Sequence, residues 1–177
     1  MLFANYLITY VKRLYKRRTV WRREAELQSR FSTEVYCILR SGGWFPGRST
    51  RVADAIQWHH HATIIFAEFG GLVFAGSGAD YSRGPDCERV SVAIDEPFFD
   101  EEMRGYGVCE IGCFRREVTM FVSMDGFVYH DGESHSGKTQ LTPLARSIDR
   151  ALECLLRGLK SQESDISEHK QIYISRS

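Results

Sequence analysis

Apolar residues recur at spacings of three and four from Val52 to Phe69, so one side of this segment is largely apolar when it is helical. Gly70 and Gly71 end the pattern, and the β-prone run 72–75 follows at once. Because glycine adopts the left-handed conformation that closes many helices, the pair predicts a direct turn from helix into strand. We expect this helix, turn and strand to pack as one unit at the centre of the fold.

Helical periodicity occurs in two more segments. Residues 25–39 repeat apolar positions, with Ser32 or Thr33 as the expected N-cap and glycines directly after the segment. Residues 144–156 carry a broader apolar stripe, and Gly158 follows the last turn. Both segments are predicted to be amphipathic helices that cover the core.

Alternation of apolar and polar residues predicts the strands. Residues 89–94 and 117–124 both alternate, which is typical of strands with one face on the core. Asp125-Gly126 connects the second of these runs to the β-prone residues 127–130, and this dipeptide is a strong signal for a β-hairpin.

The other segments are predicted to be connections. Residues 76–85 and 131–137 are dense in turn residues, which indicates surface loops. Residues 161–177 are polar and are assigned to a flexible tail, in which 172–174 pairs only transiently. Together the patterns predict one α+β domain over residues 31–160, with a mostly antiparallel sheet and packed helices.

Two short motifs lie before and at the end of the central helical segment. The first is LRSGGWFPGR at residues 39–48, and the second is FAEFGGL at residues 66–72. The motif residues expected to have structural roles are Trp44, Pro46, Gly47, Phe69, Gly70 and Gly71. In this order and spacing the motifs resemble the SUKH-3 branch of the SUKH superfamily, over about residues 34–160. The resemblance implies a SUKH-like (Smi1/Knr4-like) α+β domain.

Bacterial members of that superfamily are mostly interpreted as immunity proteins, which bind and neutralise a toxin delivered between competing cells. The resemblance therefore implies an immunity protein, or antitoxin, that neutralises a cognate secreted toxin by stoichiometric binding in the cytoplasm. The alternative is a regulatory scaffold that binds endogenous protein partners, as the yeast Smi1/Knr4 relatives do. Neither function is enzymatic.

Charge is distributed unevenly although the formal net charge is zero. Residues 1–30 carry eight Lys or Arg against two Glu, and the rest of the chain carries fifteen against twenty-one Asp or Glu. The basic N-terminal arm also has an apolar face, so an amphipathic helix on an anionic membrane or on nucleic-acid phosphates is one interpretation. The other is an arm that packs on its own domain or on a second copy. Its apolar part is too short to span a bilayer, and its charge follows the apolar part, unlike in a secretory signal.

A run of five carboxylates surrounds a Pro-Phe-Phe sequence. Its candidate partner-binding residues are Asp95, Glu96, Phe98, Phe99, Asp100, Glu101 and Glu102. One interpretation is a solvated acidic edge. The other is a docking patch for a basic toxin such as a secreted nuclease, because an inhibitor that mimics phosphate charge gains association rate and specificity. The two phenylalanines then supply aromatic anchors, unless they are buried.

The residues with chemical potential do not form a recognisable catalytic or metal motif. The consecutive histidines 59–61 point about 100 degrees apart on a helix, so they do not converge on one ion, and His59 is expected near the apolar face. Five scattered cysteines without a CxxC pair indicate reduced thiols. Cys109 and Cys113 are expected in a loop entering a strand, because glycines lie beside them, and not in a zinc site. We therefore expect no enzymatic activity, no metal and no cofactor.

Overall fold

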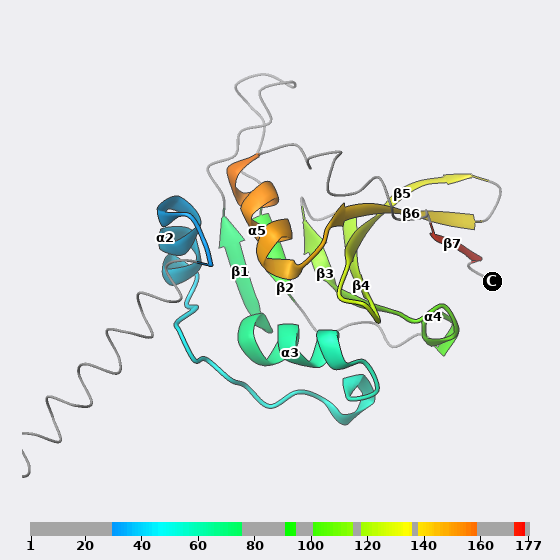
Figure 1. The fold of residues 1–177 in the computed structure, drawn as a ribbon, viewed down its shortest axis with the longest axis horizontal. Helices are drawn as coiled ribbons and strands as arrows, with labels where there is room; N and C mark the ends of the chain where they lie inside the picture. Colours follow the sequence, from blue (N-terminus) through cyan, green and yellow to red (C-terminus); the bar gives the residue numbers. More distant parts are fainter. Residues whose placement is uncertain are drawn as a thin grey trace, which may run out of the picture.

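In the described part of the chain, seven strands form one antiparallel sheet in which strand order equals sequence order, β1 to β7 (Figure 1). The computed structural model describes residues 30–75, 91–94, 101–114, 118–135, 138–158 and 172–175. Its elements in chain order are α2 (Thr33–Ser41), the 3-10 helix η1 (Asp54–Ile56), α3 (His60–Phe69), β1 (Leu72–Ala75), β2 (Ser91–Ile94), α4 (Glu101–Gly105), β3 (Val108–Phe114), β4 (Val118–Ser123), β5 (Val128–His135), β6 (Lys138–Ala145), α5 (Ile148–Arg157) and β7 (Ile172–Ser175). This arrangement confirms the predicted α+β class with a mostly antiparallel sheet. In the described part of the chain, no helix is both long and apolar enough to cross a membrane.

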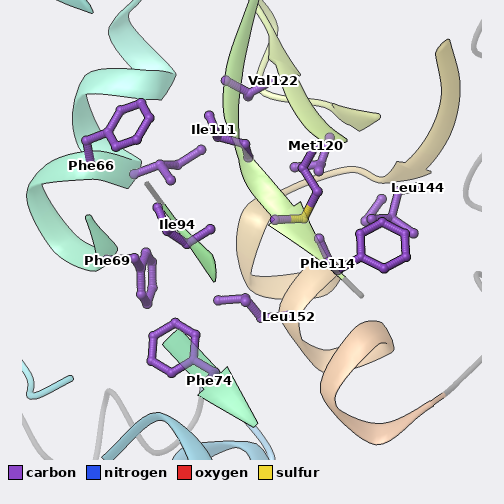
Figure 2. Close-up of a cluster of buried hydrophobic side chains, with 14 of the residues drawn as sticks. Phe66, Phe69, Phe74, Ile94, Ile111, Phe114, Met120, Val122, Leu144 and Leu152 are labelled. Atoms are coloured by element: carbon purple, nitrogen blue, oxygen red, sulfur yellow. The ribbon is translucent and has the colours of Figure 1, made fainter. Parts of the chain in front are cut away.

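Apolar side chains are buried on both faces of the sheet. Helices α2, α3 and α5 pack on one face in the larger cluster, where Phe66 and Phe69 of α3 and Leu152 of α5 surround Ile94 of β2 (Figure 2). A smaller cluster includes Met103 of α4 together with side chains from β3 to β7. Strand β4 contributes to both, since Met120 and Val122 lie in the larger cluster and Phe121 in the smaller one. The middle of the sheet is therefore covered on both sides.

The central helix is shorter than its apolar spacing predicts. Val52 and Ala53 precede the short 3-10 turn η1, and α3 begins only at His60. His59 is the N-cap, and its ring Nδ1 accepts a hydrogen bond from the Ala62 N–H at 3.2 Å. Ile56 still packs in the larger cluster, although it lies in the 3-10 turn and not in a continuous helix with α3.

The predicted Gly-Gly turn is confirmed. Gly70 lies so close to the preceding turn that a Cβ there would be 2.5 Å from the Phe66 carbonyl oxygen. Gly71 has a φ of +73°, the left-handed conformation that favours glycine. Its N–H donates to the Ile94 carbonyl at 2.7 Å, which joins the turn to β2 as β1 begins.

Three other predicted elements are present. Ser32 caps α2, where its hydroxyl accepts from the Val35 N–H. The hairpin of β4 and β5 turns at Asp125-Gly126, and Gly126 has a φ of +88°. Helix α5 is followed by Gly158 in the left-handed conformation.

The C-terminal part of the sheet differs from the prediction. Residues 131–137 were expected to be a loop, but β5 extends to His135 and pairs with β6, with irregular register between Asp131 and Ser134. Leu144 lies in β6 and not in the last helix. Residues 172–175, assigned to the flexible tail, form β7 and pair with β6. Ile174 of this strand is fully buried in the smaller cluster, which gives the pairing a hydrophobic reason.

Candidate protein-binding site

The motif residues gather where α3 ends. Trp44 is buried and stacks on Phe69, with ring centroids 6.1 Å apart and planes 13° from parallel. Its indole Nε1 donates to Glu68 Oε1 at 3.2 Å. Pro46 and Gly47 form the turn after it, and Gly47 has a φ of +79°. Trp44 therefore fixes this turn against the last turn of α3.

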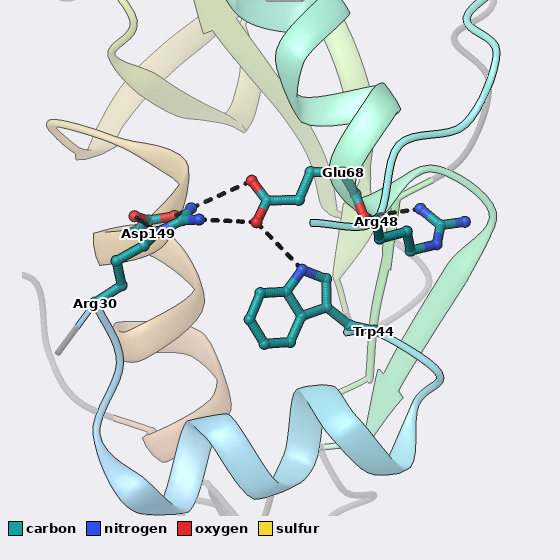
Figure 3. Close-up of polar contacts among 5 residues, drawn as sticks. All are labelled: Arg30, Trp44, Arg48, Glu68 and Asp149. Carbon is teal, nitrogen blue, oxygen red and sulfur yellow. Dashed lines mark hydrogen bonds and ion pairs between the residues drawn. The ribbon is translucent and has the colours of Figure 1, made fainter. Parts of the chain in front are cut away.

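Two arginines complete a polar network around Glu68 (Figure 3). Arg30 lies between Glu68 and Asp149, with Nη1 2.8 Å from Glu68 Oε1 and Nη2 2.6 Å from Asp149 Oδ1. The hydrogen bond to Asp149, opposed by burial and assisted by Glu68, raises the pKa of Arg30 further above neutral pH. Arg48 donates to the backbone carbonyls of Glu68 at 2.8 Å and Gly70 at 2.7 Å, which lie at the end of α3 and lack helical partners. The network joins the end of α3 to the start of α5.

The network was only partly predictable. Trp44, Phe69 and Gly70 were identified from motifs, but Arg30 was counted with the basic arm and Asp149 was not singled out. Arg30 meets partners 38 and 119 residues away in sequence, so no local pattern indicates the contact. The network explains the motif residues through stability, because its charged groups are paired with one another.

The predicted acidic patch lies mostly outside the described residues. This applies to Asp95, Glu96, Phe98, Phe99 and Asp100, while Glu101 and Glu102 begin α4. The residues that flank the run are anchored, because Ile94 before it is fully buried in the larger cluster and Met103 after it is buried in the smaller one. The acidic run therefore leads directly into α4.

A group of exposed and half-buried side chains surrounds α4, and we call it the α4 surface. It consists of Trp58, His60, His61, Arg104, Tyr106 and Met124. The Arg104 guanidinium lies over the Trp58 ring, 5.5 Å from its centroid. Tyr106 and Met124 are 41% and 53% exposed although both are large and apolar. The surface combines three segments that are far apart in the sequence.

A backbone hydrogen bond and a side-chain contact hold these segments together. Met124 N–H donates to the Gly107 carbonyl at 3.1 Å, which joins the β4–β5 turn to the residues after α4. The His61 ring covers the same turn, since a Cβ on Gly126 would lie 2.9 Å from it. The α4 surface therefore has a fixed backbone beneath its exposed side chains.

The three histidines have different surroundings. His59 is fully buried, and burial, with a smaller contribution from the charge of His61, lowers its pKa from the ordinary value of 6.5. With Nδ1 used as an acceptor, its Nε2 has no hydrogen-bond partner among the described residues. His60 is exposed, whereas His61 is half-buried over the turn. His59 therefore lies on the apolar side of its segment, as the spacing predicted.

The cysteines in β3 do not share a site. Cys109 and Cys113 lie within the strand and not in the predicted loop. Cys109 is paired across the sheet with Val122, which belongs to the larger cluster. Cys113 is paired with Thr119, and since the next residue, Met120, belongs to the larger cluster, Thr119 and Cys113 lie on the other face. The two thiols are therefore on opposite faces of the sheet. Burial and then the charge of Glu110 raise the pKa of Cys109 to about 12, so this thiol is protonated at neutral pH. Among the residues the structure describes, no group of three or more His, Cys, Asp or Glu has a geometry suited to a metal ion.

No family model, curated protein or solved structure matches the chain. The candidate site therefore rests on the geometry of the described residues. Of the two regions above, the network at the end of α3 is internally paired, and the α4 surface presents exposed apolar and cationic side chains. We take the α4 surface as the candidate protein-binding site.

Proposed function

We propose that this chain is an immunity protein that neutralises a cognate toxin by one-to-one binding through the α4 surface and the acidic run 95–102. The observation that carries the proposal is the composition of the α4 surface. Trp, Tyr, Met and Arg are the residue types enriched at interface centres, and here all four are grouped around α4, the helix in which the acidic run 95–102 ends.

The use of the carboxylates between the helices supports binding over catalysis. Glu68 accepts hydrogen bonds from Arg30 and Trp44, and Glu153 accepts from the backbone N–H and hydroxyl of Ser32. These groups hold helices α2, α3 and α5 together. A carboxylate fixed in this way by structural partners is poorly placed to exchange protons with a substrate.

Electrostatics indicate the class of toxin. Five carboxylates in eight residues attract a basic surface, such as that of a nuclease that binds phosphates. Arg104 and the exposed aromatic side chains then provide the less salt-sensitive part of the contact. Association is expected to slow at high salt, whereas dissociation is expected to depend mainly on the α4 surface.

The test is a survival assay in which the chain is co-expressed with a toxin-like C-terminal domain encoded beside its gene. We expect rescue of growth and a one-to-one complex in size-exclusion chromatography with light scattering. The variant Arg104→Ala/Tyr106→Ala should lose rescue, and the control Phe45→Ala, 50% exposed in the turn after α2, should keep it. Persistent toxicity without a complex would reject immunity for this pair and favour a scaffold that binds endogenous partners.

A further inference from the structure

A cavity of about 310 Å³ lies between the segment before η1 and the C-terminal half of α3. Its lining residues are Thr50, Arg51, Val52, Ala53, Ile56, Phe66, Gly70 and Gly71. The volume is at the lower end of the range for small-ligand sites, roughly 300–1,000 Å³. It is separate from the α4 surface, which lies at the other end of α3.

The deeper part of this cavity is apolar. Ile56 and Phe66 are 3% and 4% exposed, and both belong to the larger cluster. Half-buried Val52 packs against the same cluster from the non-helical segment. An apolar group that enters here displaces water from an already apolar wall.

The backbone groups around the cavity are used internally. Thr50 donates through its N–H to the Ala67 carbonyl at 2.9 Å and through its hydroxyl to the Phe66 carbonyl at 3.1 Å. Gly71 N–H donates to the Ile94 carbonyl at 2.7 Å, and the Gly70 carbonyl accepts from Arg48 at 2.7 Å. These groups do not compete for a ligand.

Arg51 is the charged side chain of the lining. It is exposed, and it makes no hydrogen bond or ion pair with the described part of the chain. Arg48, three residues earlier, is by contrast fully engaged at the end of α3. A guanidinium next to an apolar cavity is suited to a carboxylate that carries an apolar group.

We propose that this cavity binds a monocarboxylate with a short branched or aromatic apolar body, which rests on Ile56 and Phe66 while the carboxylate pairs with Arg51. Two sources have this chemistry: a free apolar acid, and the C-terminal residue of a peptide that ends in an apolar side chain. The proposal does not depend on toxin binding, because it uses none of the residues of the α4 surface.

The test is a titration of ¹⁵N-labelled protein followed by NMR. 4-Methylpentanoate is expected to shift the amide signals of Arg51, Val52 and Gly71 saturably, while the uncharged 4-methylpentanamide binds about two- to fivefold more weakly, as loss of one exposed ion pair implies. N-acetyl-glycyl-leucine distinguishes the sources: tighter binding than the free acid indicates a chain terminus, and weaker binding indicates a free acid.

Two variants locate the site. Arg51→Gln should weaken binding of the acid about two- to fivefold and bring it to the level of the amide, and Arg40→Gln, which changes an exposed arginine at the end of α2, should not. Ala53→Leu, which fills the mouth of the cavity, should abolish the shifts with an unchanged unfolding midpoint. Equal affinity for acid and amide, equal affinity of Arg51→Gln and wild type, or no saturation up to about 20 mM would each overturn the proposal.

Discussion

The two ends of α3 are held in contrasting ways. At its C-terminal end, Glu68 accepts hydrogen bonds from Arg30 and Trp44, and Arg48 donates to the backbone carbonyl of Glu68 (Figure 3). At its N-terminal end, the cap is a buried histidine whose Nε2 has no hydrogen-bond partner within the described part of the chain. Exposed Tyr106 and Met124 lie beside this second end, within the α4 surface.

The difference separates stability from binding. Buried polar groups that are fully paired fix one arrangement of helices, and losing one partner leaves the others uncompensated. Exposed aromatic and methionine side chains add little to folding and gain most when a partner covers them. The end of α3 with the network is thus expected to determine stability, and the start of α3 to determine recognition.

The largest effect is expected when the packing beneath the network is removed. Phe69→Ala deletes a fully buried ring that stacks on Trp44, and should lower the free energy of unfolding by about 4 kcal/mol. Phe45→Ala removes a side chain of the same size that is 50% exposed in the other motif, and should change the free energy of unfolding by less than about 0.5 kcal/mol. Urea unfolding followed by tryptophan fluorescence measures both. Similar losses of unfolding free energy in the two variants would mean that the packing beneath the network does not determine stability.

A smaller loss is expected when the network itself is broken. Glu68→Gln keeps the size of the side chain but removes the charge that faces Arg30, whose side chain is 30% exposed and partly screened. We expect a loss of about 2 kcal/mol in the free energy of unfolding. Glu34→Gln is the control, since Glu34 is 50% exposed and 3.6 Å from Arg157. If both variants lose the same small amount of unfolding free energy, the network adds no more to stability than an exposed ion pair does.

The elements with a repeated pattern and a clear end signal were predictable from the sequence. Helix α2 has a serine cap and helix α5 ends at Gly158, and the β4–β5 hairpin has Asp125-Gly126 at its turn. In each case the determining residues lie within one or two turns of the element. Local chemistry is sufficient there.

The missed elements depend on distant contacts. Strand β7 has four residues in a polar segment and forms because β6 is there to pair with it. β6 itself contains Pro143, which weakens a strand pattern, beside a register irregularity. The start of α3 was misplaced because a buried histidine is not among the common capping residues. The α4 surface was not predicted as a whole, since its three segments meet only in the folded chain.

Acidification should lower the free energy of unfolding through His59 at the start of α3. Because burial lowers the pKa of His59, the unfolded chain takes up a proton below pH 6.5 while the folded chain does not. The contribution of His59 to the free energy of unfolding is therefore fully present above pH 6.5. It declines by up to about 1.4 kcal/mol per pH unit as the pH falls from 6.5 toward the pKa of His59 in the folded chain.

The groups that face His59 are the His61 ring and the backbone of Val122 and Gly107. His59→Asn retains a capping side chain without a titrating group. Urea unfolding at pH 7.5, 6.5 and 5.5 should show a steeper loss of stability in the wild type than in this variant. Parallel pH profiles would mean that His59 does not titrate between the folded and unfolded states.

The smallest effect on stability, and the largest on recognition, is expected at the α4 surface. Tyr106→Ala/Met124→Ala removes two side chains that are 41% and 53% exposed, so the free energy of unfolding should change by less than about 0.5 kcal/mol for each. Affinity for the toxin should fall by at least about tenfold, which corresponds to about 1.4 kcal/mol. Val73→Ala, 60% exposed on β1, should leave both quantities unchanged. A variant that loses stability and keeps affinity would reverse the roles of the two ends of α3, because the exposed side chains would then support the fold and the partner would bind elsewhere.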